Sequence, residues 1–397
     1  MKAKKITDNV EWVGSVDWDR RLFDALIPLP DGTSYNAYLV RGSEKVALID
    51  TVDPPFEAEL LGRLSGVERI DYVVANHAEQ DHAGLHGVIL EEFPEATLLC
   101  TPKCKALLAD ELHIDGERIR TVADGETVEL GGKTLEFIHL PWVHWPETMV
   151  TYLRQDRVLF SCDLFGSHFA TSELFVTDER RVYEPAKRYY AEIMMPFRKL
   201  IQKHLEKLAG YDIATICPSH GPIHPRPAFI VDAYRDWTSD TPKNLAVIAY
   251  ISMHDSTRQM VNHLVEALTE RGVAVERFNL EAVDLGRLAE GLVDAATLVI
   301  GTPTVLTGAH PKVVYAAYLA NALRPKAKFA AVIGSHGWAT RAVEQVADLV
   351  KGLKLDLLPP VMIKGAPRGE DFAALNGLAA AVAEKHREAG LLTGAES

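Results

Sequence analysis

The chain has 397 residues, and 42 Lys and Arg against 55 Asp and Glu give a formal net charge of −13. Hydrophobic residues at 47% and charged residues at 24% match an average globular protein, which excludes disordered, collagen-like and disulfide-rich classes. The length exceeds one ordinary domain, and the acidic balance lacks the basic surface that nucleic acid or anionic lipid requires. We therefore expect more than one domain, and neither nucleic acid nor a membrane as a partner.

Four cysteines are present, and no two of them form a C-x-x-C pair, which argues against a rubredoxin-type or zinc-ribbon module within this chain. The first residues carry positive charge without the apolar core of a signal peptide. No stretch approaches the roughly 18 apolar residues of a membrane span. The sequence therefore predicts free thiols and a cytoplasmic protein.

Residues 1–244 contain short apolar runs typical of strands, with helical stretches between them. The predicted strands cover residues 34–39, 45–50, 71–75, 96–101, 127–130, 134–139 and 158–162. The glycine pair before Lys133 lacks the first glycine of a phosphate-binding loop, because Thr127 stands at that position, so we predict a hairpin turn there. Two charged stretches, 185–195 and 199–208, are predicted to be solvent-exposed faces of helices.

A dense group of metal-binding residue types follows the predicted strand 71–75. Its members are His77, Glu79, Asp81 and His82. A loop directly after a buried strand aims such donors into one space, whereas an isolated histidine is more often a structural residue. The density of donors therefore predicts a metal site.

Three more candidate ligands lie at the ends of probable strands: His144, Asp163 and His220. Taken singly, His144 could pack between the nearby tryptophans, Asp163 could cap a turn, and His220 could be an exposed loop residue. Together with the first group they give four histidines, three carboxylates and no thiolate. Such an oxygen-rich ligand set favours iron or manganese.

The polar stretch 237–244, which contains Pro242, predicts a domain boundary, with one domain at 1–244 and the other at 245–397. Beyond it, apolar runs at 245–251, 273–279, 296–300, 329–333 and 354–362 alternate with amphipathic stretches. Strands separated by helices in this way predict a doubly wound parallel α/β domain.

Three loops at the ends of these strands are candidates for a flavin site. They contain Ser252, Met253, His254, Asp255, Ser256 and Thr257; then Thr302, Pro303, Thr304 and Gly308; and then Ser335, His336, Gly337 and Trp338. Hydroxyl and backbone N–H groups at the first strand-to-helix turn suit a phosphate, although a capped helix without ligand is the alternative. The nicotinamide fingerprint G-x-G-x-x-G is missing, and the three loops together resemble flavodoxin with FMN bound.

The H-x-E-x-D-H motif with its distant His, Asp and His resembles the metallo-β-lactamase fold. With the flavodoxin-like part, the whole chain resembles the flavodiiron proteins (A-type flavoproteins). This resemblance implies an αββα metallo-β-lactamase-like sandwich followed by a flavodoxin-like doubly wound parallel sheet. Zinc hydrolases usually carry histidine where this chain has Glu79, which tips the choice towards iron.

Further implications of the resemblance concern the individual site residues. One iron is expected on His77, Glu79, His144 and Asp163, and the other on Asp81, His82, Asp163 and His220, with Asp163 as the bridge. From the residues alone, His168 could orient the site from behind the ligands or be a polar residue on a loop. His86 and His224 are expected to face elsewhere, and His139, on a strand, is expected to lie in the core. The segment Phe23-Asp24-Ala25-Leu26, with neither His nor Tyr, is expected to form part of the gas-site wall.

The activity implied by the resemblance is reduction of O2 to water with four electrons, or of two NO to N2O and water, with electrons passed from FMN to two irons per chain. A separate donor such as rubredoxin, and a head-to-tail homodimer or a dimer of dimers, are also implied. A di-zinc hydrolase with an accessory flavin domain is the alternative, and a redox sensor is the third reading. Two departures from the family pattern are His254-Asp255 at the usual phosphate-loop glycine and His336 in place of an aromatic residue.

Overall fold

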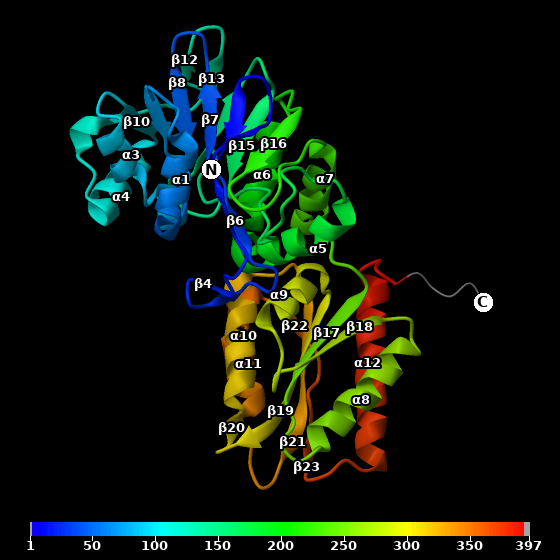
Figure 1. Ribbon diagram of the computed structural model, residues 1–397. Coiled ribbons are helices and arrows are strands. Elements are labelled where there is room, and N and C mark those ends of the chain that lie inside the picture. The colour runs from blue at the N-terminus through cyan, green and yellow to red at the C-terminus, as the bar shows by residue number, and fades with distance from the viewer. Residues whose placement is uncertain (1, 393–397) are drawn as a thin grey trace. The chain divides into compact units, whose positions relative to one another are not determined.

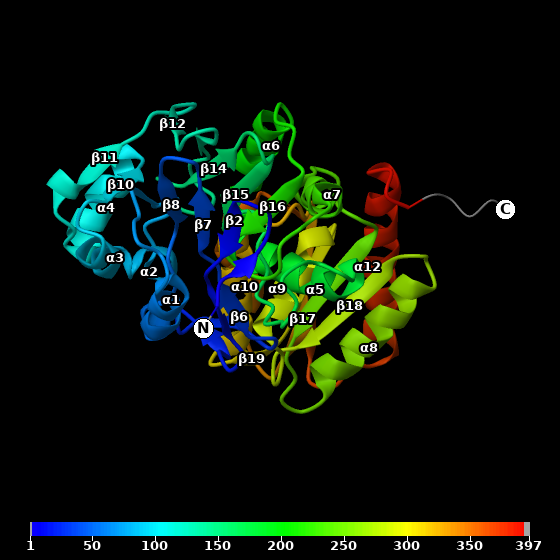
Figure 2. The same cartoon turned by 45° about the horizontal axis from the view of Figure 1, so that its top comes forward.

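The computed structural model describes residues 2–392, and the chain forms two compact units, Met1–Thr238 and Ser239–Ser397. Figures 1 and 2 show the elements of each unit. The division comes at the end of helix α7 (Pro227–Thr238). The predicted boundary at residues 244 and 245 lies a few residues further on, where β17 (Leu245–Tyr250) begins.

The first unit contains two main sheets. The larger one runs in the order β1 (Lys4–Lys5), β2 (Val10–Trp12), β7 (Tyr38–Arg41), β8 (Val46–Ile49), β9 (Tyr72–Val74), β10 (Thr97–Cys100) and β11 (Ile119–Thr121). The smaller one runs β12 (Thr127–Glu129), β13 (Thr134–His139), β14 (Met149–Leu153), β15 (Val158–Cys162) and β16 (Thr215–Pro218). Two short ribbons pair β3 (Ser15–Asp17) with β6 (Thr33–Tyr35), and β4 (Leu22–Phe23) with β5 (Ile27–Pro28).

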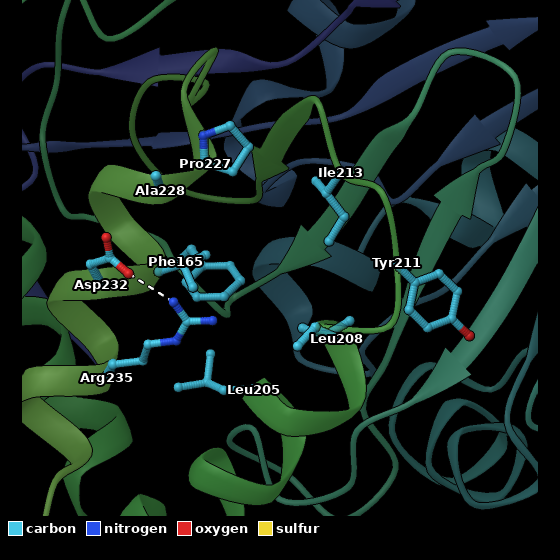
Figure 3. Close-up of a pocket in the computed structure, with 11 residues that line it drawn as sticks. Phe165, Leu205, Leu208, Tyr211, Ile213, Pro227, Ala228, Asp232 and Arg235 are labelled. Atoms are coloured by element: carbon cyan, nitrogen blue, oxygen red, sulfur yellow. Dashed lines mark hydrogen bonds and ion pairs between the residues drawn. The ribbon is translucent and has the colours of Figure 1, made fainter.

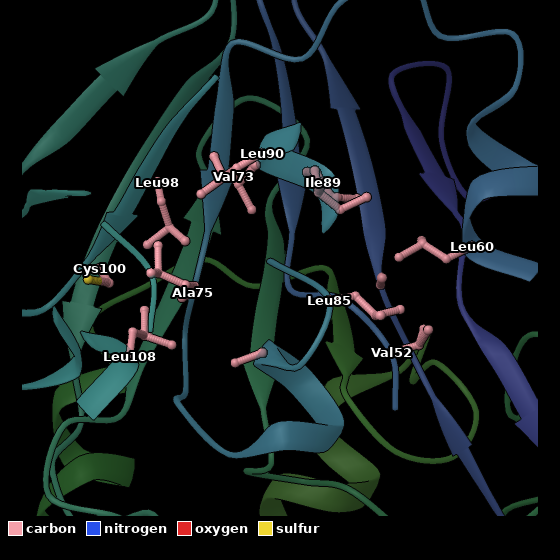
Figure 4. Packing of buried hydrophobic residues seen from close by; sticks show 14 of the residues in the cluster. Val52, Leu60, Val73, Ala75, Leu85, Ile89, Leu90, Leu98, Cys100 and Leu108 are labelled. Atoms are coloured by element: carbon pink, nitrogen blue, oxygen red, sulfur yellow. The ribbon is translucent and has the colours of Figure 1, made fainter. Parts of the chain in front are cut away.

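Successive side chains of the central strands enter two different cores, because they point to opposite faces of the sheet. Leu48 packs in the core that α1 (Glu57–Leu64), α3 (His86–Glu92) and α4 (Pro102–Leu112) cover, which Figure 4 shows. Ala47 and Ile49, its neighbours, pack in the core between the two sheets. Helices α6 (Arg198–Leu208) and α7 lie beside β15 and β16 (Figure 1). The unit is therefore a sandwich of two sheets with a layer of helices on each outer side.

Several predictions for this unit are wrong in detail. The predicted strand 34–39 is two strands, because Asn36 between β6 and β7 turns its amide group to the carbonyls of Pro218 and Gly221, each at 2.8 Å. The apolar run that forms β14 was missed, although it lies at the centre of the smaller sheet. The glycine pair before Lys133 does form the predicted turn between the antiparallel strands β12 and β13, with positive φ at both glycines.

The stretch 185–195 is not the solvent-exposed face that its charges predict. Helix α5 (Glu179–Tyr189) and the π-helical turn that follows it (Tyr190–Met194) bury one apolar and aromatic side. This side contains Ala186, Tyr189, Tyr190, Ala191 and Met194. Helix α6, over 199–208, is likewise only partly exposed, since Ile201, Leu205 and Leu208 are buried. The charged residues had masked a helical apolar stripe.

The second unit is a doubly wound sheet. Its order is β18 (Ala274–Asn279), β17, β19 (Thr297–Val305), β21 (Phe329–His336) and β22 (Asp356–Leu357), with all of these neighbours parallel. The predicted strand 354–362 is split into β22 and β23 (Val361–Lys364), because the intervening prolines donate no ladder hydrogen bond. The short strand β20 (Gly308–Ala309) pairs with the end of β19.

Helices cover both faces of this sheet (Figure 1). One face packs against α8 (Ser256–Thr269) and α12 (Gly369–Glu388), and the remaining helices are α9 (Leu285–Asp294), α10 (Pro311–Leu323) and α11 (Ala342–Leu349). The order of the strands reverses between β17 and β19, and the loops after these strands and after β21 meet at one edge. Within residues 2–392, no helix is both long enough and apolar enough to cross a membrane.

Candidate functional site

The first group of predicted ligands gathers around the loop after β9. His77 Nε2 and His144 Nε2 each lie 3.1 Å from Glu79 Oε2. The same two nitrogens lie 3.5 and 3.6 Å from Asp163 Oδ2. Neighbouring ligands of one metal ion are about 3 Å apart when each bond is about 2.1 Å, so the four side chains have the spacing of one metal site.

A second group lies directly beside the first. His82 Nε2 and His220 Nε2 each lie 3.2 Å from an oxygen of Asp81, and 3.1 and 3.4 Å from Asp163 Oδ1. Asp163 therefore presents Oδ2 to one group and Oδ1 to the other. All seven predicted ligands lie together: Asp81 and His82 are in the short helix α2 (Gln80–Ala83), and the others are in loops or turns that follow strands.

The charge balance of the two groups fits bound cations. Both oxygens of Asp81, together with Asp163 Oδ2 and His82 Nε2, are buried and have no hydrogen-bond partner among the described residues. Burial opposes the ionised form of Asp163, but His82 and His220 outweigh it and hold the pKa of this carboxyl well below its usual range. Buried carboxylate oxygens that have no hydrogen-bond partner are suited to metal ions.

Cys162 is the one thiol that approaches these residues, since its Sγ lies near His82 and Asp163. Burial raises the pKa of the Cys162 thiol well above its usual value. The seven predicted ligands themselves offer only nitrogen and oxygen donors, and this chemistry suits iron or manganese.

Glu147 supports the first group and was missed by the sequence analysis. Its Oε1 lies 2.6 Å from His77 Nδ1 and accepts a hydrogen bond from the backbone N–H of Ala78 at 3.0 Å. Burial lowers the pKa of His77, but the bonds to Glu147 and Glu79 outweigh it and raise the pKa well above its usual value. Glu147 lies close to the candidate ligand His144 in the sequence, and this proximity could have identified it as a residue of the site.

Tyr189 supports Asp163 and was also missed. Its hydroxyl donates a hydrogen bond to Asp163 Oδ1 at 2.9 Å, and its side chain is buried. It lies in the stretch 185–195 that was predicted to be exposed. Only the apolar stripe of α5 could have shown that this tyrosine faces inward.

His168 lies behind the second group. Its Nδ1 is 3.0 Å from the Thr33 hydroxyl, and its ring centroid is 5.1 Å from that of His220. His220 itself donates from Nδ1 to the carbonyl of Ser34 at 2.8 Å. Because burial holds the pKa of His168 well below its usual value, this ring is neutral beside His220.

Three further histidines considered in the sequence analysis, His86, His139 and His224, lie outside both ligand groups. His86 is buried without a hydrogen-bond partner among the described residues, and burial lowers its pKa to about 3. His224 Nε2 donates to the carbonyl of Phe165 at 3.1 Å, and burial lowers its pKa to about 4. His139 ends β13 and is partly buried.

The β4–β5 hairpin borders the site. The buried ring of Phe23 lies 5.4 Å from that of His168 and 6.4 Å from that of His220. Asp24 follows with positive φ, and burial together with the charges of Glu79 and Asp81 raises its pKa. This segment therefore provides an apolar ring and an acidic group near the metal ligands.

A separate cavity of about 310 Å³ lies between α6 and α7 (Figure 3). Its wall is mainly apolar and includes Phe165 from the turn after Asp163, and the ion pair of Asp232 with Arg235 at 2.8 Å lies at its edge. None of the predicted site residues lines it.

The second unit has a cavity of about 430 Å³ at the predicted loop edge. Eleven of the predicted residues line it: Ser252, Met253, His254, Ser256, Thr257, Pro303, Thr304, Ser335, His336, Gly337 and Trp338. Gly365 and Ala366, which follow β23, also line it and were missed, because the loop after the fifth strand was not considered.

Three predicted contacts do not line this cavity. Asp255 turns to Arg258 and to Gln259 of its own helix, as expected for an acid that would repel a phosphate. Thr302 is buried and accepts a hydrogen bond from the backbone N–H of His310 at 3.0 Å, so it braces the loop instead. Gly308 lies in β20 beside Gln345.

The cavity suits a phosphate-bearing flavin. Thr257 Oγ1 is buried in the first turn of α8 and has no hydrogen-bond partner among the described residues. A hydroxyl at a helix N-terminus, where backbone N–H groups are unpaired, is a typical phosphate donor. Trp338 is 81% exposed, which leaves its ring face free to cover a flat ligand.

Comparison with known proteins places the chain in one family. Residues 33–221 match the family model described as ODP family beta lactamase. A nitric oxide reductase of Moorella thermoacetica is 38% identical over 379 residues, which cover 92% of this chain and 94% of the relative. A rubredoxin-oxygen oxidoreductase of Megalodesulfovibrio gigas is 33% identical, over 96% of this chain and 98% of the relative.

Solved structures agree in fold. The rubredoxin oxygen:oxidoreductase from the anaerobe Desulfovibrio gigas superposes with a TM-score of 0.94 at 31% identity, over 98% of this chain and 100% of the other. The flavodiiron protein from Giardia intestinalis superposes with a TM-score of 0.92 at 29% identity, over 98% of each chain. With the two ligand groups that Asp163 joins and the flavodoxin-like second unit, these matches show that the chain belongs to the flavodiiron protein family.

Proposed function

We propose that this protein is an oxidoreductase that reduces O2 to water, NO to N2O, or both, at two iron ions per chain, with FMN as its electron-transferring cofactor. The observation that carries the proposal is Asp163, whose two oxygens face two separate ligand groups. A carboxylate placed in this way can bridge two metal ions about 3.5–4 Å apart, a spacing at which one small molecule reaches both. The names of the nitric oxide and oxygen-reducing relatives fit the same substrates.

The ligands divide between the two irons as their distances suggest. His77, Glu79, His144 and Asp163 would hold one, and Asp81, His82, Asp163 and His220 the other. Bound there, the iron pair would supply two electrons together to a gas molecule, and reduced FMN would supply those that are still needed. Glu147 and the Ser34 carbonyl engage Nδ1 of His77 and His220, which would leave Nε2 of each ring to bind iron.

FMN would lie in the cavity of the second unit. Thr257 and the N-terminus of α8 would receive the phosphate, Pro303 and Thr304 would border the ring system, and Trp338 would cover it. A mononucleotide fits this edge better than a dinucleotide, because the loop after β17 lacks the glycine fingerprint.

A zinc hydrolase is less well supported. Glu79 adds a carboxylate where such hydrolases usually carry a histidine, and hydrolysis has no use for a flavin cavity. The ligand set with three carboxylates and no thiolate also favours iron over zinc.

Electrons would come from a separate donor such as rubredoxin, since the chain contains no C-x-x-C pair. The family resemblance suggests a head-to-tail homodimer, or a dimer of dimers, in which the flavin of one chain serves the irons of the other. The four cysteines are buried and free, which suits a cytoplasmic location.

The test measures metal, flavin and gas turnover on the same preparation. Protein purified from its natural source should contain two irons and one FMN per chain. The reduced donor should drive consumption of O2, or of NO under anaerobic conditions, and running both gases at matched concentrations gives the preference. Two zinc ions per chain with neither gas consumed would contradict the proposal.

A further inference from the structure

The His220 loop, residues 218–221, is hydrogen-bonded along its length to the segment where β6 ends and β7 begins. We propose that Asn36 is a positioning residue that holds this loop in its metal-binding position, and so sets the metal affinity of the second ligand group separately from that of the first. This inference rests on the proposed function, which makes His220 a ligand of one iron.

Three alternate residues of this segment face the loop, as alternate residues of an extended chain do. The first, Ser34, accepts from His220 Nδ1 with its carbonyl and from the backbone N–H of Gly221 with its hydroxyl, each at 2.8 Å. The last, Tyr38, donates from its hydroxyl to the carbonyl of Pro218 at 2.6 Å. The segment therefore binds both ends of the loop and the ring of the ligand itself.

Asn36 is the middle one of the three. Its backbone N–H donates to the carbonyl of Ser219, and its side-chain amide donates to the carbonyls of Pro218 and Gly221, all at 2.8 Å. The orientation of the amide is fixed, because the indole N–H of Trp12, which can only donate, bonds to Asn36 Oδ1 at 2.8 Å. One buried side chain thus ties together the backbone on both sides of the ligand.

The same loop is also bonded to the segment that carries the shared carboxylate of the two groups. The backbone N–H of Ser219 donates to the carbonyl of Cys162 at 2.8 Å, and that of Ser167 donates to the carbonyl of His220 at 3.1 Å. Gly221 has a φ of +80°, and a side chain at this position would overlap Ser167. The loop is therefore held between two segments, and removing the bonds to one of them lets it move.

A loop that is already ordered binds metal more tightly than a mobile one, because a mobile loop loses conformational entropy when it binds. The two ligand groups have different supports of this kind. The side-chain bonds of Asn36 go to Trp12 and the His220 loop, whereas His77 of the first group is held by Glu147. Loss of the Asn36 amide should therefore weaken one metal position and spare the other.

These bonds also stabilise the fold, as buried hydrogen bonds do in any protein. A positioning role differs from a purely structural one because only the second ligand group responds to it. Leu153→Ala is the control for stability, since Leu153 packs in the same core as Trp12 and Tyr38. Its loss destabilises the unit and removes no hydrogen bond from the His220 loop.

A second, milder pair of variants tests the same loop with less disturbance of the core. Tyr38→Phe removes a single hydroxyl that donates to a backbone carbonyl of the loop. Tyr152→Phe is its matched control, because the Tyr152 hydroxyl donates at 2.8 Å to the backbone carbonyl of Asp212, which belongs to neither ligand group. This pair decides the question if the Asn36 variant does not fold.

The experiment measures the metal occupancy of each ligand group by itself. Full-length protein is equilibrated without oxygen at graded concentrations of ferrous iron and crystallised, and anomalous diffraction at the iron absorption edge gives the occupancy of each position. Asn36→Leu keeps a branched side chain of similar size and removes the amide donors. Iron titration in solution gives the affinities, and circular dichroism and gas consumption are measured on the same samples.

We expect Asn36→Leu to lower the iron affinity of the second group about 10- to 100-fold and to leave the first group within about twofold of the wild type. Glu147→Gln should show the reverse pattern, and the combined variant should be weakened at both groups. Tyr38→Phe should lower the affinity of the second group about 2- to 10-fold. Tyr152→Phe and Leu153→Ala should follow the wild type.

Three results would overturn the inference: equal losses at both groups in Asn36→Leu, an unchanged second group in that variant, or loss of the second metal in Leu153→Ala. Equal occupancies in Tyr38→Phe and Tyr152→Phe would do the same where Asn36→Leu does not fold. Two irons bound in the wild type with neither gas consumed would overturn the proposed activity alone. A wild type that binds iron at neither group would overturn both.

Discussion

His77 Nδ1 lies 2.6 Å from Glu147 Oε1, and neither side chain has exposed surface. The contact leaves His77 Nε2 directed towards Glu79 and Asp163. A carboxylate behind a histidine ligand fixes the ring orientation and strengthens the donor nitrogen. Glu147 thus acts on the first ligand group through His77 and is not itself one of the predicted ligands.

Replacing Glu147 tests this role. Glu147→Gln keeps the shape of the side chain and removes the charge that holds the His77 ring. Loss of such a partner typically weakens metal binding by about 10- to 100-fold. Iron titration under anaerobic conditions should therefore show one weakened site and one nearly unchanged site. Glu129→Gln, at an exposed position on β12, is the matched control and should bind iron like the wild type.

Asp163→Asn tests the bridge between the two ligand groups. The amide offers a single oxygen, so the groups around His77 and His82 can no longer share both ends of one carboxylate. Iron content should fall below two per chain, gas consumption should be lost, and FMN content should stay normal because the flavin cavity belongs to the second unit. Asp124→Asn removes a surface ion pair with Lys207 and leaves an amide oxygen that can still accept from the backbone N–H of His139, so this variant should retain both metals. Two irons in Asp163→Asn would show that the carboxylate is not a bridge.

Thr257→Val tests the phosphate end of the flavin cavity. The substitution keeps the branched shape and removes a buried hydroxyl that lacks a hydrogen-bond partner among the described residues. A hydrogen bond to a charged group contributes about 1.5–3 kcal/mol, so FMN affinity should fall roughly 10- to 150-fold. Fluorescence titration with riboflavin, which has no phosphate, should show little difference between variant and wild type. If the affinities for FMN and for riboflavin fell equally, the phosphate would have to bind elsewhere. Thr269→Val, at the exposed end of α8, is the control.

Much of the fold could be predicted because its patterns are local. The strands of the second unit are short apolar runs between turns, and their ends locate the loops of the flavin cavity. The sequence does not show where a strand is interrupted by a distant contact, as happens at Asn36, which is held by carbonyls on either side of His220. Nor does charge content show which side of α5 faces the core, because a helix can carry Arg and Lys on one side and bury Tyr189 on the other.

That the seven candidate metal ligands lie together could be predicted, because four of them are close in sequence and the rest follow strand ends. Glu147 and Tyr189 could not, since a lone Glu or Tyr has no motif and acquires its role only through tertiary packing. Among the flavin contacts, Thr302 was misjudged because a hydroxyl in a loop can serve the backbone as well as a ligand. Gly365 and Ala366 carry no distinctive side-chain chemistry, and only the sheet order brings them to the cavity.

His386 gives the second unit a dependence on pH that is separate from the metal site. The side chain is fully buried, with Nδ1 2.7 Å from Asn244 Oδ1 and Nε2 2.7 Å from the Thr297 hydroxyl. Because Asn244 Oδ1 can only accept, Nδ1 carries the proton, and Nε2 accepts from Thr297. Burial lowers the pKa of His386 to about 4, against about 6.5 in an unfolded chain.

The sign of the effect follows from where the proton binds. Below about pH 6.5 the histidine binds a proton in the unfolded chain, whereas His386 in the folded chain does not. The contribution of His386 to the free energy of unfolding is therefore fully present above this pH and is lost as the pH falls towards 4. The loss should reach about 2 kcal/mol near pH 5. Urea unfolding followed by flavin fluorescence should show this slope in the wild type and a flatter profile in His386→Gln. His263→Gln, which alters a half-buried histidine of α8 bonded to Asn376, should keep the wild-type slope. If His386→Gln kept it too, the pH dependence would have to come from another buried group.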